Sequence, residues 1–100
     1  MYTLEITESA ERDLDRIVEY IGVRLANPPA ALALLDEIDR VSESLRESPE
    51  LFALCADTRL AERGYRKALV RAYILVFEIE VDTVRVLRFF HSSEDYQNKL

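Results

Sequence analysis

The sequence predicts an α+β fold in which a strand, a helical hairpin and a three-stranded antiparallel meander follow one another. Between residues 8 and 47, apolar residues recur at the spacing of a helix, whereas from Gly64 onward they alternate or cluster as in strands. A short strand-like segment, residues 1–6, precedes the helical part. The predicted order is therefore β-α-α-β-β-β, with the helical hairpin packed on one face of a small sheet.

Length and composition agree with one folded domain over residues 1–100. A chain of 100 residues, 49% hydrophobic and 32% charged, is typical of a single globular core. No apolar run has the length of a signal peptide or a membrane span, so we expect a cytoplasmic protein that does not bind membranes. One cysteine, Cys55, and one histidine are too few for a protein-only tetrahedral zinc site, and we expect neither a metal nor a cofactor.

Two amphipathic helices are predicted before residue 48. Thr7 is a suitable N-cap for the first helix, at about residues 8–25. Asn27 followed by Pro28 starts the second, which ends before Pro49. Since the connection is short, the helices should pack antiparallel. The predicted core positions are Ala10, Leu14, Ile17, Val18, Ile21 and Leu25 in the first helix and Ala31, Leu34, Leu35, Ile38, Val41 and Leu45 in the second.

The second half of the chain is predicted to form most of the sheet. Residues 48–63 show no clear period, and we expect a loop there. Strands are predicted at residues 65–71, 73–80 and 83–90, with a turn at Val81 and Asp82. Consecutive strands this close should form an antiparallel meander, and the opening strand should pair at one edge of it.

Positive charge is concentrated in the sheet half. Residues 1–58 hold 5 basic and 13 acidic side chains, whereas residues 59–100 hold 8 basic and 6 acidic ones, in a chain of net charge -6. Basic side chains within strands must emerge on an exposed face, at an edge or at a strand end. We therefore predict a surface for an acidic or polyanionic partner, formed by Arg66, Lys67, Arg71 and Arg85.

The last strand and the tail carry three more candidate residues. Arg85 and Arg88 have opposite parity, so they cannot share a sheet face without a bulge. Arg88 has the parity of apolar residues such as Val86, which predicts either a buried ion pair or, as we favour, a cleft residue. His91 is expected to be either a packed, hydrogen-bonded residue or a catalytic one, and Tyr96 to pack the tail onto the sheet.

Several short motifs follow one another in a fixed order. They are Ala10 with Asp13-Leu14, Asn27-Pro28, Pro49, Gly64-Tyr65-Arg66, Phe77, and finally Val86, Arg88, His91 and Asp95-Tyr96. In order and spacing they resemble the RelE/ParE superfamily of bacterial toxins, and the resemblance covers nearly the whole chain. It implies a small cytoplasmic toxin of a type II toxin-antitoxin module, encoded beside an antitoxin that wraps the toxin and masks its active surface.

The resemblance implies one of two activities. ParE-like members bind DNA gyrase and do no known chemistry, whereas RelE-like members cut mRNA in the ribosomal A site. Cleavage by a 2'-hydroxyl needs a cation for the phosphorane charge and groups that move protons. In a RelE-like protein the catalytic residues would be Arg66, Arg88, His91 and Tyr96: the arginines for phosphate charge, His91 as base or acid, and Tyr96 for stacking or proton donation.

Two features favour the ParE-like interpretation. The pI near 4.8 is unusual for a protein that would be surrounded by ribosomal RNA, and the long helical hairpin resembles the ParE-like branch more closely. Ribosome-dependent mRNA cleavage is the alternative. A more remote one is a non-toxic interaction module, which the absence of a neighbouring antitoxin-like reading frame would favour.

Overall fold

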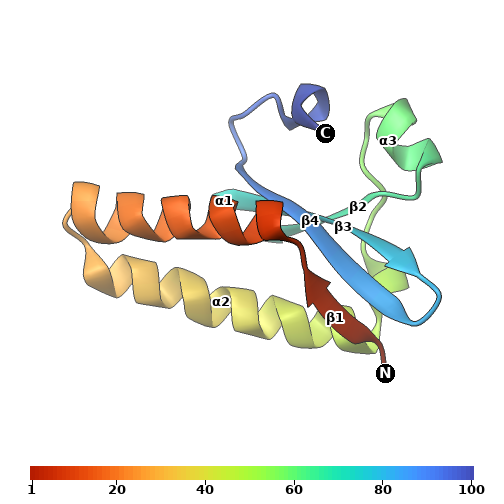
Figure 1. Cartoon of the computed structure of the whole chain (residues 1–100), viewed down its shortest axis with the longest axis horizontal. Coiled ribbons are helices and arrows are strands. Elements are labelled where there is room, and N and C mark those ends of the chain that lie inside the picture. The colour runs from red at the N-terminus through yellow and green to blue at the C-terminus, as the bar shows by residue number, and fades with distance from the viewer.

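A computed structural model describes all 100 residues. The elements are β1 (Thr3–Ile6), α1 (Glu8–Glu19), a π-helical turn (Tyr20–Arg24), α2 (Pro28–Glu47), a 3-10 turn (Pro49–Leu51), α3 (Thr58–Glu62), β2 (Arg66–Val70), β3 (Tyr73–Glu80), β4 (Thr83–His91) and a C-terminal 3-10 turn (Tyr96–Lys99). In Figure 1 the α1–α2 hairpin crosses one face of the sheet and extends well beyond it. None of the helices has the length and apolarity needed to span a bilayer.

The four strands form one mixed sheet in the order β1-β4-β3-β2. β2, β3 and β4 are the predicted antiparallel meander, and β1 lies at the edge, parallel to β4. The predicted α+β class and the order β-α-α-β-β-β are therefore confirmed. The edge position of β1 matters for the site because β1 ends at Ile6 while β4 continues to His91.

The predicted caps begin both helices. The Thr7 hydroxyl accepts a hydrogen bond from the Ala10 amide, and the Asn27 side chain accepts one from the Ala30 amide, both at 3.2 Å. The first helix does not keep α geometry to residue 25, because it widens into the π-helical turn at Tyr20–Arg24. The wider turn shifts the residues that follow it, so the prediction of Leu25 as core is wrong, and its side chain is 56% exposed.

Both faces of the sheet are covered. The hairpin face is packed around Leu34, Ile38, Leu45, Val70, Leu75, Phe77, Val84, Val86 and Phe89. The opposite face is packed around Cys55, Leu60, Ile74, Val76, Phe90 and Tyr96, contributed partly by residues 55–60 and by the tail. The two clusters therefore assign the strand residues to one face or the other.

The prediction of a loop at residues 48–63 is wrong. This stretch holds the 3-10 turn and α3, and Leu54 forms an isolated antiparallel bridge with Arg66. Asp57 begins α3 by accepting hydrogen bonds from the amides of Arg59 and Leu60. A five-residue helix is too short to show an apolar period, which explains why the pattern did not indicate it.

A bulge in β4 changes the predicted faces. Val76 is opposite Arg88 whereas Phe77 is opposite Val86, so Leu87 has no partner in β3. Val86 consequently lies on the hairpin face, while Arg88 lies with Val76 on the opposite face. The prediction that Arg88 shares a face with Val86 is wrong, because parity along a strand reverses at the extra residue.

The two turns of the meander each hold a non-glycine residue with positive φ. Arg71, between β2 and β3, and Val81, between β3 and β4, both have φ of 56°. This region is costly for L-residues and most costly for a β-branched one such as Val81. The turn at Val81 and Asp82 was expected from the sequence, but its strain was not.

Candidate functional site

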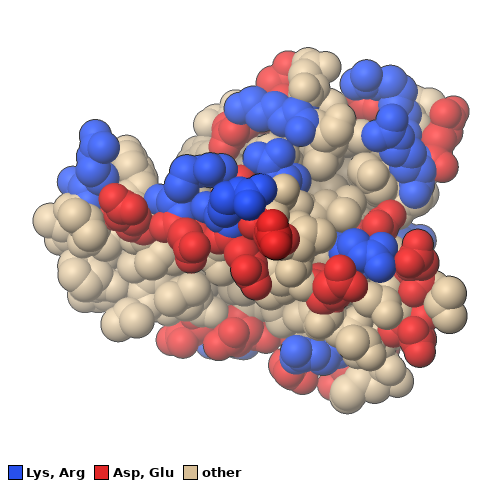
Figure 2. All heavy atoms as spheres, in the orientation of Figure 1, with Lys and Arg blue, Asp and Glu red and all other residues tan.

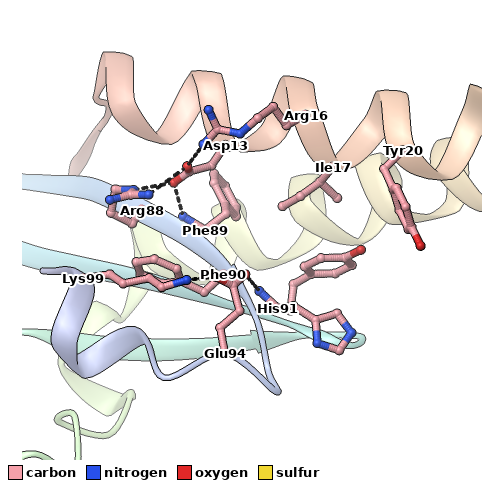
Figure 3. A pocket seen from close by; sticks show the side chains of 11 residues that line it. Asp13, Arg16, Ile17, Tyr20, Arg88, Phe89, Phe90, His91, Glu94 and Lys99 are labelled. Atoms are coloured by element: carbon pink, nitrogen blue, oxygen red, sulfur yellow. Dashed lines mark hydrogen bonds and ion pairs between the residues drawn. The ribbon is translucent and has the colours of Figure 1, made fainter. Parts of the chain in front are cut away.

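A pocket of about 480 Å³ lies where α1 passes β4 and the C-terminal tail, and it gathers charged and aromatic side chains (Figure 3). Its lining residues are Asp13, Arg16, Ile17 and Tyr20 from the first helix, Tyr73 from β3, Arg88, Phe89, Phe90 and His91 from β4, and Glu94 and Lys99 from the tail. It therefore joins parts of the chain that are up to 86 residues apart in sequence.

The pocket exists because α1 replaces a strand at the edge of β4. Past the end of β1, the Thr7 amide donates to the Val86 carbonyl at 3.1 Å and the Thr7 hydroxyl donates to the Leu87 carbonyl at 3.0 Å. Further along, the Phe89 amide donates to Asp13 Oδ2 at 3.0 Å. The Thr7 amide and the side chains of Thr7 and Asp13 thus satisfy backbone groups that would otherwise be unpaired at a sheet edge.

Asp13 also holds Arg88. The Asp13 carboxylate, which is 4% exposed, accepts hydrogen bonds from Arg88 Nε at 2.6 Å and from Arg88 Nη2 at 3.1 Å. Arg16 Nη2 donates to the same carboxylate at 2.7 Å. These hydrogen bonds to Asp13 raise the pKa of Arg88, whose guanidinium also lies 4.8 Å from the centre of the Phe90 ring. Arg88 is thus both an ion-pair member and a wall of the pocket.

The tail forms the other wall. Glu94 accepts from the His91 amide at 2.9 Å and from Lys99 Nζ at 2.7 Å. The hydrogen bond from Lys99 is the main reason that the pKa of Glu94 is lowered, and the amide of His91 adds to it. The two carboxyl oxygens therefore tie the end of β4 to the last residues of the chain.

His91 is exposed, hydrogen-bonded and packed against a tyrosine. Its Nδ1 accepts from the Ser93 amide at 3.1 Å and lies 2.7 Å from the Ser93 hydroxyl oxygen. Its ring meets the Tyr73 ring edge-on, with 5.3 Å between centroids. His91 thus has the position of a hydrogen-bonded residue at the margin of the pocket.

The pocket suits an anionic group. Arg16, Arg88 and Lys99 bring three positive charges to the lining, against the two carboxylates of Asp13 and Glu94. Arg16 and Lys99 are largely exposed, so donors that their ion pairs leave free can reach a bound carboxylate or phosphate. No cluster of three or more His, Cys, Asp or Glu side chains is arranged to hold a metal ion.

Of the four residues proposed for RNA chemistry, the pocket holds Arg88 and His91 but not Arg66 and Tyr96. Arg66 lies on β2 and pairs with Phe77 on the hairpin face, and its Nη1 donates to the carbonyls of Phe52 at 2.6 Å and Glu50 at 3.2 Å. Arg66 and Arg88 therefore arise from opposite faces of the sheet.

Tyr96 is buried on the sheet face opposite the hairpin. Its ring stacks on Phe90 with 5.7 Å between centroids. Burial is the main reason that the pKa of its hydroxyl is raised, and the neighbouring Cys55 adds to this. Burial likewise raises the pKa of the Cys55 thiol. The Tyr96 hydroxyl thus faces the protein interior.

The predicted cationic surface is divided in the structure. Lys67 and Arg71 lie on β2 and in the turn after it, and neither forms an ion pair. Arg85 lies on β4, where it pairs with Glu78 at 2.9 Å, Glu80 at 3.2 Å and Glu5 at 3.3 Å. The hydrogen bond to Glu78 is the largest of the effects that raise the pKa of Arg85. Three carboxylates therefore offset the charge of Arg85.

Four charged residues of the pocket were not predicted from the sequence: Asp13, Arg16, Glu94 and Lys99. Asp13 has a signal that could have found it, because it lies three residues after Ala10 and four before Ile17, on the apolar stripe of the helix. An acid on a buried stripe needs a buried cation. The bulge and the path of the tail, which position the other groups, leave no comparable pattern.

The chain was compared with known families and structures. The family described as the ParE toxin of type II toxin-antitoxin system, parDE, matches residues 4–96. The chain belongs to this family. It is therefore a toxin of a type II toxin-antitoxin system, and the resemblance to the RelE/ParE superfamily is confirmed.

Two solved structures support the same fold. One is the chromosomal ParDE toxin-antitoxin system from P. aeruginosa, with a TM-score of 0.72 and 22% identity over 91% of this chain and 96% of that chain. The other is the RelBE2 toxin-antitoxin complex from Mycobacterium tuberculosis, with a TM-score of 0.61 and 25% identity over 90% of this chain and 96% of that chain. No match was found among curated protein sequences.

Proposed function

We propose that this toxin arrests growth by binding DNA gyrase, and that a cognate antitoxin holds it inactive in the cytoplasm until needed. The ParE family match favours the gyrase-binding branch. The observation that carries the proposal is the separation of the residues that RNA cleavage would need. Arg66 and Arg88 arise from opposite sheet faces, and the Tyr96 hydroxyl faces the interior.

The separation argues against a composite nuclease site. General acid-base chemistry requires each group to lie within hydrogen-bond reach of the reacting atoms. β3 lies between β2 and β4, so the backbones that carry Arg66 and Arg88 are about 10 Å apart before the difference in face is counted. The Arg66 guanidinium is also engaged by two backbone carbonyls. These residues would have to rearrange to act on one phosphate.

The antitoxin is proposed to cover β2 and the turn after it, beyond the bridge that Leu54 forms with Arg66. Lys67 and Arg71 have no ion-pair partners, and the exposed Leu69 lies between them in sequence. A segment with acidic residues around an apolar one matches this surface. Both solved neighbours come from toxin-antitoxin systems, which agrees with an antitoxin partner.

Ribosome-dependent mRNA cleavage is the second candidate. The observation in its favour is that Arg88 and His91 share a pocket that suits an anion. The two candidates give different results with purified components. We expect the toxin to inhibit DNA supercoiling by gyrase and to leave ribosome-bound mRNA intact.

One variant tests the proposal further. Tyr96→Phe removes only a buried hydroxyl, so inhibition of gyrase by this variant should equal that of the parent. A nuclease that used the Tyr96 hydroxyl would lose about 100-fold or more in cleavage rate. Cleavage of ribosome-bound mRNA that falls by that amount in Tyr96→Phe, with no effect on gyrase by the parent, would overturn the gyrase proposal.

A further inference from the structure

The distal end of the helical hairpin exposes large apolar side chains. Val23 is 72% exposed and Leu32 63% exposed, and Tyr20 and Leu25 are more than half exposed. Figure 1 shows the reason, since this part of the hairpin extends past the sheet and has no core to pack against. In Figure 2 the same end of the molecule, at left, is mostly uncharged surface. Clustered exposed apolar side chains of this size are typical of binding surfaces.

Two of these side chains, Val23 and Leu32, border a groove between the two helices. A hollow of about 600 Å³ lies along the hairpin, lined by Val18, Gly22, Val23, Pro28, Ala31, Leu32 and Leu35 with Asp15 and Glu19. Its floor is shallow because small residues face each other there: a Cβ placed on Gly22 would lie 3.7 Å from the Ala31 Cβ. The hollow is therefore a shallow, mostly apolar depression over the contact between the two helices.

The groove continues toward β1. Leu35 lines both this hollow and a second one of about 470 Å³, which also contains Leu4, Ile6, Leu14 and Ile38 together with Asp39, Ser42, Glu43 and Arg46. Because Leu35 lies in both, the two hollows form one apolar track along the hairpin. An elongated track of this kind accommodates a helix better than a compact ligand.

The borders of the track are acidic. Asp15 and Glu19 line the first hollow, and Asp39 lines the second, and none of these three carboxylates forms an ion pair. Glu43 is paired with Arg46, the only basic residue of the two linings. Unpaired carboxylates beside exposed apolar area attract a partner that is both apolar and basic.

The π-helical turn is a separate observation at the same place. It covers Tyr20–Arg24, which includes Gly22 in the floor and Val23 at the border of the first hollow. Such turns, with i to i+5 hydrogen bonds, are rare within helices. Where they do occur, they are frequently found at functional sites. Here the turn coincides with the most exposed apolar part of the hairpin.

We propose that this track, made up of the two hollows that meet at Leu35, binds a basic amphipathic helix of a partner protein. Apolar residues at i, i+3, i+4 and i+7 of that helix enter the two hollows, and flanking lysines or arginines pair with Asp15, Glu19 and Asp39. Anionic lipid is disfavoured by the acidic borders, and a second copy of the chain would place like charges together. The track is distinct from the β2 surface that we propose for the antitoxin, so the inference does not rest on that assignment.

A synthetic peptide tests the proposal with the full chain. The probe is an 18-residue fluorescein-labelled helical peptide with leucine at i, i+3, i+4 and i+7 spacing and lysine elsewhere, and its control has the same composition in scrambled order. Fluorescence anisotropy should show binding of the patterned peptide at least ten-fold tighter than that of the scrambled one. The affinity should fall as salt is raised, because the ion pairs are exposed.

Matched variants identify the surface. Binding of the patterned peptide should weaken ten-fold or more in each of three variants within the track: Leu32→Asp, Val23→Asp, and the double variant Asp15→Lys with Glu19→Lys. Binding should change less than two-fold in two control variants at exposed positions outside the track, Leu51→Asp and Glu47→Lys. Circular dichroism checks the fold of each variant, and the charge pair provides a readout should both aspartate variants unfold. Equal binding of both peptides, or equal effects of Leu32→Asp and Leu51→Asp, would overturn the proposal. So would a dimer on gel filtration that Leu32→Asp dissociates, since the track would then hold a second copy.

Discussion

Removal of the Asp13 carboxylate should destabilise the protein more than removal of any exposed charge. Asp13→Ala leaves Arg88 without its two hydrogen bonds and leaves the buried Phe89 amide without an acceptor. Breaking a buried pair by deleting one partner costs about 3 to 5 kcal/mol, and a lost acceptor for a buried amide costs about 1 to 3 kcal/mol.

The expected loss at this site is at the lower end of the sum of these two costs. Arg88 is 27% exposed, so water partly solvates its charge once Asp13 is gone, and the pair contributes toward the lower end. We therefore expect Asp13→Ala to lower the free energy of unfolding by about 4 kcal/mol. Asp13→Asn keeps one acceptor for the Phe89 amide and should cost about half as much. Natural domains are stable by roughly 5 to 15 kcal/mol, so Asp13→Ala should retain a folded population whose unfolding by urea can be measured.

Urea unfolding followed by far-ultraviolet circular dichroism measures these differences. The matched control is Arg16→Ala, which removes a 69% exposed partner of the same carboxylate and should cost less than about 1 kcal/mol. A double-mutant cycle between Asp13 and Arg88 should give a coupling energy above about 1 kcal/mol. If the free energies of unfolding of Asp13→Ala and Arg16→Ala agree within about 1 kcal/mol, then Asp13 is not what docks α1 on β4.

Three further predictions concern the hairpin, a turn and the tail. Leu34→Ala, at a buried core position, should lower the free energy of unfolding in urea by about 2 to 5 kcal/mol. Glu43→Ala, on the exposed side of the same helix, should lower it by under about 1 kcal/mol. Similar urea midpoints for the two variants would show that the buried face of α2 has been assigned wrongly. Val81→Gly should leave the stability of the protein unchanged or raise it by up to about 1 kcal/mol, because glycine adopts a positive φ without strain. Thr83→Gly, in the adjoining strand, should destabilise the protein. A loss of more than about 1 kcal/mol from Val81→Gly would exclude backbone strain at Val81. Since the pKa of Glu94 is lowered from 4.5 in the folded protein, its stabilisation of the tail is present above pH 4.5 and is lost as the pH falls through the folded pKa. The NMR chemical shift of the His91 amide should therefore titrate with a midpoint below pH 4.5 in the parent and should not titrate in Glu94→Gln. A midpoint at or above pH 4.5 would contradict the contact between Glu94 and the His91 amide.

Local patterns in the sequence were sufficient for the order of the main helices and strands. Thr7 and Asn27 mark the helix starts by their capping chemistry, and the apolar alternation from Gly64 onward marks the strands, because these signals act over a few residues. The signal failed where an element was short or irregular. α3 has five residues, and the π-helical turn shifts Leu25 out of the stripe to which its spacing assigned it.

The candidate site depended on contacts that no local pattern records. Arg88 and His91 could be proposed from their residue types, but the face of Arg88 is set by the bulge at Leu87. Arg66 and Tyr96 were grouped with them on chemical grounds, yet Arg66 binds carbonyls near the end of α2 and Tyr96 stacks on Phe90. The tail brings Glu94 and Lys99 to the pocket through long-range packing, which a sequence pattern does not specify.

The order in which DNA and protein synthesis stop in bacterial cells tests the central claim most directly. The toxin is induced without its antitoxin, and incorporation of labelled thymidine and labelled methionine is followed in the same culture, with Arg66→Ala and Tyr96→Phe beside the parent. A gyrase-binding toxin predicts that DNA synthesis falls and DNA damage signalling rises first, while translation continues, and that Tyr96→Phe is as toxic as the parent. Arrest of translation within minutes, before any change in DNA synthesis, would contradict the account.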